Sequence, residues 1–170
     1  MNPSLRAAAV FVAALPLAGF SFRASAEPPS PLPIEKLPIY DTTSIGELAV
    51  DSASRVAAES GRRLLVNFGT NDCAPCRVVN DAIYEEPFLT AFFQQFVPVF
   101  VDVAPGSENR ELLARYGIDP AKGLPAVVLS DEQLKVAEVT KEGELVPVAA
   151  KGKDAVRAWI LARFRKDPAK

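Results

Sequence analysis

The sequence of 170 residues contains no histidine, and its only methionine is Met1. Histidine is the commonest general base and metal ligand in proteins, and copper sites favour the methionine thioether. These absences exclude catalysis by a histidine base and argue against a copper or other metal carrier. Only two cysteines are present, Cys73 and Cys76. A structural zinc site uses four cysteine or histidine ligands, so this pair cannot form one alone.

An excess of basic residues is also lacking, because 19 Lys and Arg stand against 21 Asp and Glu. Arg6 and Arg23 lie in a segment that we expect to be removed and that has no acidic residue, so the mature chain would carry a net charge of −4. Nucleic-acid-binding domains show a clustered basic excess instead. With 49% hydrophobic and 24% charged residues, the composition predicts a globular protein that does not bind nucleic acid.

A long membrane-spanning run is missing as well. The apolar stretch 7–22 would span about 24 Å as a helix, against about 30 Å of membrane hydrocarbon. Arg6 precedes this stretch, and Ala24-Ser25-Ala26 supplies the small-x-small pattern that signal peptidase cleaves. We therefore expect a signal peptide at 1–26, cleaved after Ala26, and a periplasmic or otherwise exported protein. An uncleaved membrane anchor is the alternative.

The rest of the chain divides into a leader, a domain and a short tail. Seven of the 15 prolines fall in the first 40 residues, so residues 27–40 read as an extended, proline-rich leader. Residues 41–166 alternate between helical and strand patterns and form one predicted domain, with 167–170 as a tail. A mature chain of about 144 residues has the usual size for a single core.

Apolar spacing predicts the order of elements in the domain. Its first helix would bury a face made of Ile45, Leu48, Ala49, Ser52 and Val56, and its last helix would turn Arg157 toward water. We expect helices at 43–60, from Cys73 to about 83, after Pro87, at 108–116 and at 154–165. The helix after Pro87 carries an aromatic stripe of Phe88, Leu89, Phe92, Phe93 and Phe96. We expect strands at 64–68, 97–103, 126–129 and 134–139.

This order predicts an α/β fold in three layers, a mixed sheet of four to five strands flanked by helices. A right-handed crossover makes the first two strands parallel, and the last two form a hairpin. The cysteines follow the carboxyl end of the first strand. Open α/β sheets bind their ligands at that edge, so the position of the cysteines is typical of a functional site.

Cys73-Ala74-Pro75-Cys76 opens the predicted second helix. At positions i and i+3 the two sulfurs can meet, and the helix N-terminus favours a thiolate. The alternative is a stapling disulfide. Closing a loop of four residues removes only about 2 kcal/mol of unfolded-state entropy, against about 4–5 kcal/mol for a loop near 100 residues. The spacing therefore favours a redox role over a staple.

With Tyr116-Gly117-Ile118 and Gly123-Leu124-Pro125-Ala126 before a hairpin, the CxxC sequence resembles the thioredoxin superfamily, in particular exported bacterial members. The resemblance covers about residues 41–165. It implies that Cys73 is the nucleophile and Cys76 the resolving cysteine, joined as a redox disulfide without a further cofactor. It also implies that Pro125 is a cis-proline facing the cysteines and that Leu124 offers backbone contacts to a bound partner chain.

Two residues depart from this family pattern. Thioredoxins carry a buried acid in the first strand that helps to deprotonate the resolving thiol, whereas this chain has Asn67, which exchanges no proton at ordinary pH. Resolution would then be slower or use water. Most relatives have Trp before the first cysteine, whereas this chain has Asp72. Its charge opposes a thiolate at Cys73, or alternatively it caps the helix.

We therefore expect an exported thiol-disulfide oxidoreductase that acts on protein thiols and disulfides. We expect it to be a monomer. Ala74-Pro75 supplies no charge that would make the disulfide strongly oxidising, which favours a reductase or general exchanger. One domain would then need an external reductant, such as a membrane thiol transporter. The alternative is a binding or chaperone-like module of thioredoxin fold whose disulfide is inert.

Overall fold

The fold is known from a computed structural model that describes residues 38–164. The predicted signal peptide, residues 27–37 of the predicted leader and the predicted tail lie outside the described residues. Among those described, no helix has the length and apolar character needed to cross a membrane. The elements are α1 (Gly46–Ser60), β1 (Arg63–Gly69), α2 (Ala74–Ile83), α3 (Phe88–Gln95), β2 (Phe96–Asp102), α4 (Arg110–Arg115), the 3-10 turn η2 (Pro120–Lys122), β3 (Ala126–Ser130), β4 (Val136–Val139), α5 (Leu145–Ala149) and α6 (Lys153–Phe164).

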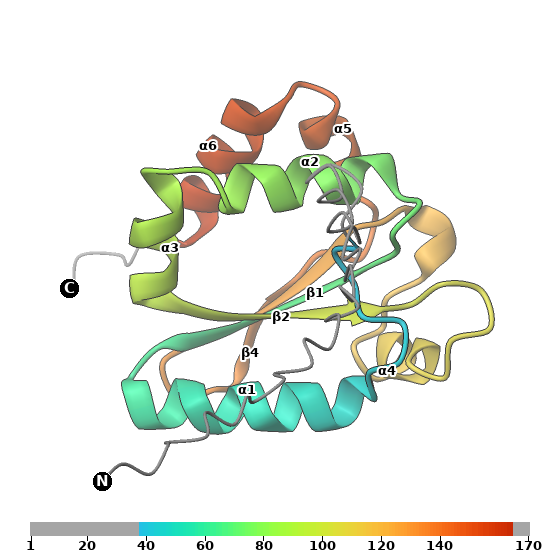
Figure 1. The fold of residues 1–170 in the computed structure, drawn as a ribbon, viewed down its shortest axis with the longest axis horizontal. Coiled ribbons are helices and arrows are strands. Elements are labelled where there is room, and N and C mark those ends of the chain that lie inside the picture. Colours follow the sequence, from blue (N-terminus) through green and yellow to red (C-terminus); the bar gives the residue numbers. More distant parts are fainter. Residues whose placement is uncertain (1–37, 165–170) are drawn as a thin grey trace, which may run out of the picture. The chain divides into compact units, whose positions relative to one another are not determined.

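The four strands form one mixed sheet in the order β2-β1-β3-β4. β1 pairs with β2 in parallel, and it pairs with β3 in antiparallel orientation. β3 and β4 form the predicted hairpin. The sheet carries α2, α3, α5 and α6 on one face and α1 and α4 on the other (Figure 1). The predicted α/β class and mixed sheet of three layers are confirmed.

Each face of the sheet has its own apolar core. β1 is buried along almost its whole length and contributes alternate side chains to both cores. Leu65 packs with Val79 and Ile83 beneath α2, whereas Val66 and Phe68 pack on the side of α1 and α4. A central strand buried on both faces is held rigidly, so the loop that follows it starts from a fixed point.

The first helix ends at Ser60 as predicted but begins at Gly46 and not at residue 43, and its predicted buried face is wrong. Ile45, Leu48 and Val56 are 60%, 59% and 45% exposed, whereas Val50 and Ala57 are buried. The reason is that small residues let the helix approach the sheet closely. A Cβ atom at Gly46 would lie only 2.7 Å from Val101, so a larger side chain there would push α1 away.

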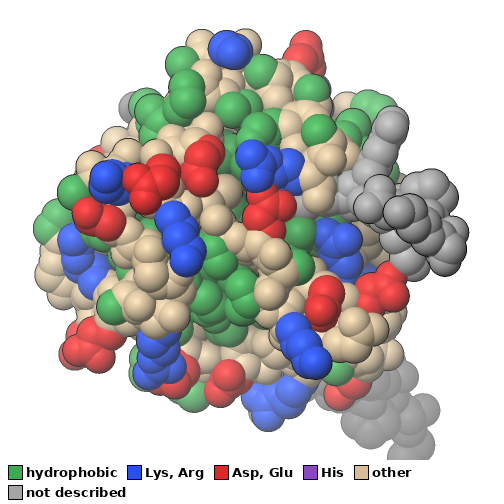
Figure 2. Space-filling model, turned by 180° about the vertical axis from the view of Figure 1, so that it is seen from behind, with side chains coloured by type: hydrophobic (Ala, Val, Ile, Leu, Met, Phe, Trp, Pro, Cys, Tyr) green, Lys and Arg blue, Asp and Glu red, His purple; other side chains and the backbone are tan. Residues whose placement is uncertain are grey.

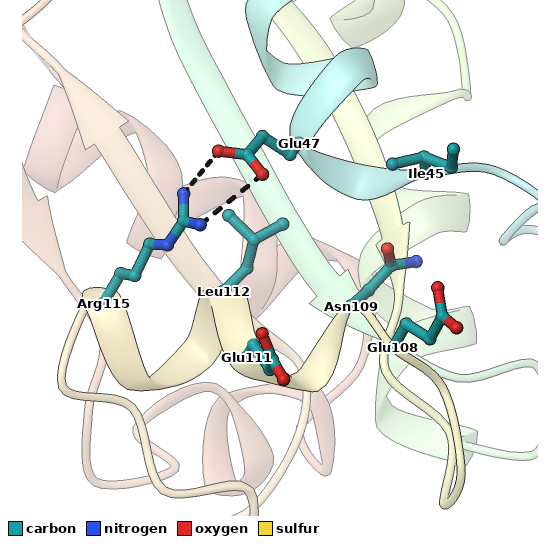
Figure 3. Close-up of a pocket in the computed structure, with 7 residues that line it drawn as sticks. All are labelled: Ile45, Glu47, Glu108, Asn109, Glu111, Leu112 and Arg115. Carbon is teal, nitrogen blue, oxygen red and sulfur yellow. Dashed lines mark hydrogen bonds and ion pairs between the residues drawn. The ribbon is translucent and has the colours of Figure 1, made fainter.

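Asn109 ties α1 to α4 and to the end of β2. Its Oδ1 accepts a hydrogen bond of 2.7 Å from the backbone N–H of Gly46, the first residue of α1, and Ile45 at the N-cap position offers no side-chain cap. Its Nδ2 donates to the carbonyl oxygens of Ser44 and Asp102. In Figure 3, Asn109 lines a hollow between these helices, where Arg115 also forms an ion pair with Glu47.

Arg157 does not face water, which corrects the prediction for the last helix. Its side chain is 21% exposed and pairs with Glu85 and Asp154, and its Nε donates to the carbonyl oxygen of Ala82 at the end of α2. The aliphatic stem and planar guanidinium of arginine suit such a half-buried position. Arg157 therefore joins α6 to α2.

Several element boundaries also differ from the prediction. Phe96 belongs to β2 and not to the aromatic stripe of α3, and the strand predicted from 134 begins at Val136. Leu134 has a positive φ of 60°, which is turn and not strand geometry. The short elements η2 and α5 were not predicted, because fewer than six residues show no helical period.

The face opposite to that of Figure 1 carries acidic and basic side chains in close alternation. Figure 2 shows Lys and Arg side chains beside Asp and Glu across the middle and lower parts of this face, with apolar side chains between them. Charges of both signs so close together give no extended field of one sign on this face.

Candidate active site

The cysteines lie where the buried strand β1 passes into α2. Residues 70–72 form the connecting turn, and Cys73 is the N-cap of α2. Its Sγ accepts a hydrogen bond of 3.1 Å from the backbone N–H of Cys76. Pro75 sits in the first turn of the helix, where its missing N–H costs little. The helix N-terminus thus points its N–H groups and its positive dipole end at Cys73.

Cys73 and Cys76 are joined by a disulfide, with their Cα atoms 5.2 Å apart. The two sulfurs differ in access: Cys76 is completely buried, whereas Cys73 is partly exposed. An incoming sulfur can therefore reach Cys73 and not Cys76. This asymmetry suits Cys73 for attack on a partner and Cys76 for resolution of the resulting mixed disulfide.

The loop before β3 completes the site. The Leu124-Pro125 peptide bond is cis, Pro125 is buried, and the Sγ of Cys73 lies 3.4 Å from the carbonyl oxygen of Leu124. Leu124 and Pro125 thus lie beside the accessible cysteine, although they follow it by about fifty residues. On its other side Cys73 borders an open hollow that is also lined by Asn71, Asp72, Ala74, Arg77, Val78 and Asp81.

The two residues that depart from the family pattern have different surroundings. Asp72 is exposed at the rim of this hollow. Its alternative role as the helix N-cap is wrong, because Cys73 holds that position. Asn67 is completely buried on the α2 side of β1, and its Oδ1 accepts a hydrogen bond of 3.3 Å from the hydroxyl of Tyr40.

Sequence reasoning missed Tyr40, which it assigned to the end of the leader. The side chain is 1% exposed and packs edge-on against Phe100. Asn71, in the turn before the cysteines, accepts from the backbone N–H groups of Ile39 and Tyr40 and donates to the Tyr40 carbonyl. A lone tyrosine after a proline-rich stretch carries no periodic signal, so only the fold reveals that it belongs beneath the site.

Within residues 38–164, no three Cys, Asp or Glu side chains lie close enough together to hold a metal ion. The chemistry that the site offers is thus that of its two sulfurs: one accessible, one buried, and a backbone carbonyl beside the accessible one.

Comparison with known proteins agrees with this geometry. Residues 46–131 match the model of a family described as thioredoxin-like. No curated protein sequence matches the chain. Among solved structures, the chain is similar to the disulphide isomerase from Xylella fastidiosa Temecula1, with 26% identity and a TM-score of 0.68, over 75% of this chain and 97% of that one.

The family match covers half of the chain and includes the cysteine pair, and the structural match extends over nearly all of the isomerase. The disulfide at the start of α2 is the redox group that such proteins use. The chain therefore belongs to the thioredoxin-like family and is a thiol-disulfide oxidoreductase.

Proposed function

We propose that the protein is exported and acts as a reductase, or general exchanger, of protein disulfides. The observation that carries the proposal is the pairing of an accessible Cys73 with a buried Cys76 beside the Leu124 carbonyl. In the reductive cycle the Cys73 thiolate attacks a substrate disulfide and forms a mixed disulfide. Cys76 then displaces the substrate thiol, so that the substrate is reduced and the cysteine pair is oxidised.

The charges next to Cys73 in the sequence support the proposed direction of electron flow. A strongly oxidising pair needs groups that stabilise the thiolate, because this stabilises the reduced form. Here Ala74 and Pro75 are apolar, and the nearest carboxylate in the sequence, Asp72, is exposed at the rim of the same hollow. Its negative charge opposes the thiolate and so favours the disulfide form. The pair is then a better electron donor than acceptor.

A reductase with a single cysteine pair must be reduced again after every turnover. We infer an external reductant, such as a membrane thiol transporter, that delivers electrons to Cys73 through the same exposed surface. Protein thiols and disulfides are the inferred substrates. A monomer is sufficient for this cycle, since both cysteines come from one chain.

The experiment is reduction of a protein disulfide, such as those of insulin, with dithiothreitol as the electron source. The mature protein should accelerate the reduction, Cys73→Ser should abolish the acceleration, and Cys76→Ser should accumulate a mixed disulfide with the substrate. If the wild-type protein does not accelerate the reaction, the catalytic proposal fails, and binding of an unfolded protein equally by wild type and Cys73→Ser would favour a chaperone-like module.

The similarity to a disulphide isomerase favours isomerisation as a second candidate. Isomerisation begins with the same attack by Cys73, but a substrate thiol then displaces Cys73 and forms a new substrate disulfide. The cysteine pair is reduced again in this step, so no net reductant is needed. Recovery of activity by a scrambled disulfide protein, at a catalytic amount of the reduced protein, distinguishes the two. Without another electron source, a reductase is oxidised after reducing a small fraction of the substrate and leaves the rest scrambled, whereas an isomerase returns it to the native, fully disulfide-bonded form.

Export is tested on the full chain produced in a Gram-negative bacterium. Our proposal expects the protein in the periplasmic fraction, with a mass that corresponds to cleavage after Ala26. An intact chain in the membrane fraction would mean that residues 1–26 act as an anchor, and an intact chain in the cytoplasm would overturn export.

A further inference from the structure

The resolving cysteine must lose a proton before its sulfur can attack the mixed disulfide, and Asn67 cannot accept that proton. The space next to Cys76 is filled by Tyr40. A Cβ atom on Gly69 would lie 2.1 Å from the Tyr40 hydroxyl oxygen and 2.9 Å from the Cys76 sulfur. Both atoms therefore lie close to the position that a side chain on Gly69 would occupy, and Gly69 is the one residue of β1 that has no side chain.

A carboxylate lies on the same face of the sheet. Asp102 of β2 pairs with Gly69 of β1 in parallel register, as Phe100 pairs with Asn67. Paired residues of parallel strands direct their side chains to the same face. The ring of Tyr40 contacts Phe100, two residues before Asp102, which places Tyr40 over this part of β2.

Two polar atoms of this cluster are buried without a partner within the described part of the chain. They are Oδ1 of Asp102, a residue 3% exposed, and Nδ2 of Asn67, a residue with no exposure. Native proteins pair the large majority of buried polar atoms, so two unpaired ones on residues that act on Tyr40 point to a state in which they are used. An unpaired carboxylate oxygen can accept a proton, and an unpaired amide can donate to a thiolate.

We propose that Tyr40 transfers the proton of the Cys76 thiol to Asp102, in place of the buried acid that Asn67 replaces. The Cys76 S–H bond breaks and its proton passes to the Tyr40 oxygen. The Tyr40 hydroxyl, which donates to Oδ1 of Asn67 in the disulfide form, turns toward β2 and passes its own proton to Oδ1 of Asp102. The Cys76 sulfur then forms a bond to Cys73, and the bond from Cys73 to the substrate sulfur breaks. The substrate leaves as a thiolate with the electron pair, and Asp102 later releases its proton to solvent.

The surroundings suit a neutral hydroxyl in this role. Burial, followed by the charge of Asp102, raises the pKa of Tyr40 far above its usual value of 10. The hydroxyl therefore keeps its proton at physiological pH and acts by exchanging one proton for another. Asp102 on β2 is the charged group that acts on Tyr40, and Cys73, the N-cap of α2, is the residue bonded to Cys76. Asp72, Arg77 and Asp81 line the open hollow outside.

This inference rests on the thiol-disulfide exchange of the proposed function, but not on its direction. The test is a rapid-mixing reaction of the reduced protein with the chromogenic disulfide 5,5′-dithiobis(2-nitrobenzoate). Attack by Cys73 releases one coloured thiolate in a bimolecular phase, and resolution by Cys76 releases a second in a unimolecular phase. Only the second phase requires the Cys76 proton to leave.

Tyr40→Phe keeps the ring and removes the hydroxyl, and Asp102→Asn removes the proton acceptor. We expect each variant to slow the second phase at least about tenfold near neutral pH without changing the first phase. At about pH 10, hydroxide ionises Cys76 directly, so the second phase should recover to the wild-type rate. Tyr116→Phe, on the opposite face of the sheet, is the matched control and should leave both phases unchanged.

A second phase in Tyr40→Phe and in Asp102→Asn that equals wild type at every pH would overturn the proposal. A slowing that persists at high pH would overturn it too, because a distorted site is not repaired by hydroxide. If one variant fails to fold, as judged by its near-ultraviolet circular dichroism, the second phase of the other variant still tests the proposal. A wild-type protein that releases no second thiolate would contradict the exchange chemistry itself.

Discussion

At the scale of single residues, the site differs from a thioredoxin in the groups around its sulfurs and not in the sulfurs themselves. Cys73, Cys76, Leu124 and Pro125 could all be selected from the sequence, because a CxxC pair and a downstream proline form local patterns. Tyr40 could not be selected, since its place beneath the site follows from hydrogen bonds that Asn71 makes with the backbone of Ile39 and Tyr40. Residues that act through tertiary contacts carry no local pattern.

The charge of Asp72 should tune the reduction potential. Replacing it with Asn removes a negative charge beside Cys73, which stabilises the reduced thiolate form and makes the potential less negative. An exposed charge is worth up to about 1 kcal/mol, so the shift should be on the order of 10–20 mV. The measurement is equilibration with glutathione, followed by alkylation of free thiols.

Asp81→Asn is the control for this prediction, because Asp81 is also exposed on the hollow but two helical turns further from Cys73. It should change the potential less than Asp72→Asn does. High salt should reduce the effect of Asp72→Asn, since it screens exposed charges. A shift toward a more negative potential would show that Asp72 does not oppose the thiolate.

At the scale of helices and strands, the sequence predicts existence and order better than orientation. Gly61 ends α1 as expected, with a positive φ of 63° that places it at the left-handed C′ position. The buried face of the same helix was predicted from its largest apolar residues, whereas packing selects Val50 and Ala57. Large apolar side chains on a surface are common, so apolar size alone does not identify the inner face.

Asn109 should be worth more to stability than an exposed asparagine. Asn109→Ala removes the side-chain partner of the first N–H group of α1 and of the Ser44 carbonyl, while the Asp102 carbonyl keeps its hydrogen bond from the Ser107 hydroxyl. We expect a loss of about 2 kcal/mol in the free energy of unfolding, measured by urea denaturation. Asn80→Ala is the control, because among residues 38–164 its side chain forms a hydrogen bond only with the adjacent Asp81 on α2, and it should change stability by less than about 0.5 kcal/mol. Equal effects would contradict the capping role of Asn109.

Glu85 should stabilise the contact between α2 and α6 in a pH-dependent way. Hydrogen bonds from Lys153 and Arg157, together with their charges, lower the pKa of Glu85 below its usual value of 4.5. A group with a lowered pKa in the folded state stabilises the protein above its unfolded pKa, and this stabilisation is lost as pH falls through the folded value. Wild type should therefore exceed Glu85→Gln in thermal stability at pH 7, and this difference should disappear as the pH falls below 4.5 and through the lowered pKa of Glu85 in the folded state.

Thermal unfolding followed by circular dichroism across this pH range checks the prediction. Glu59→Gln, which removes an exposed carboxylate at the end of α1, is the control and should show little difference from wild type at any pH. A gap between wild type and Glu85→Gln that widens in acid would contradict the ion pairs of Glu85.

At the scale of the whole molecule, the strand pattern predicts the mixed sheet because β1 and β3 are short, continuous apolar runs between turn residues. The sequence could not reveal how the sheet brings Asp102 next to Gly69, since register between strands depends on packing along their full length. On the buried side of the candidate site, the sequence therefore pointed to Cys76 and Asn67 but not to Tyr40 and Asp102. Tyr40 and Asp102 are the groups that we propose accept the proton of Cys76.

The central claim is that Cys73 and Cys76 form a redox-active pair that donates electrons. The measurement that tests it most directly is the reduction potential of this pair in the mature protein, obtained by equilibration with dithiothreitol or glutathione. We predict a value near the ~−270 mV of thioredoxin, reached within minutes. A value near ~−120 mV would contradict an electron donor, and a disulfide that exchanges only over hours would contradict a redox-active site.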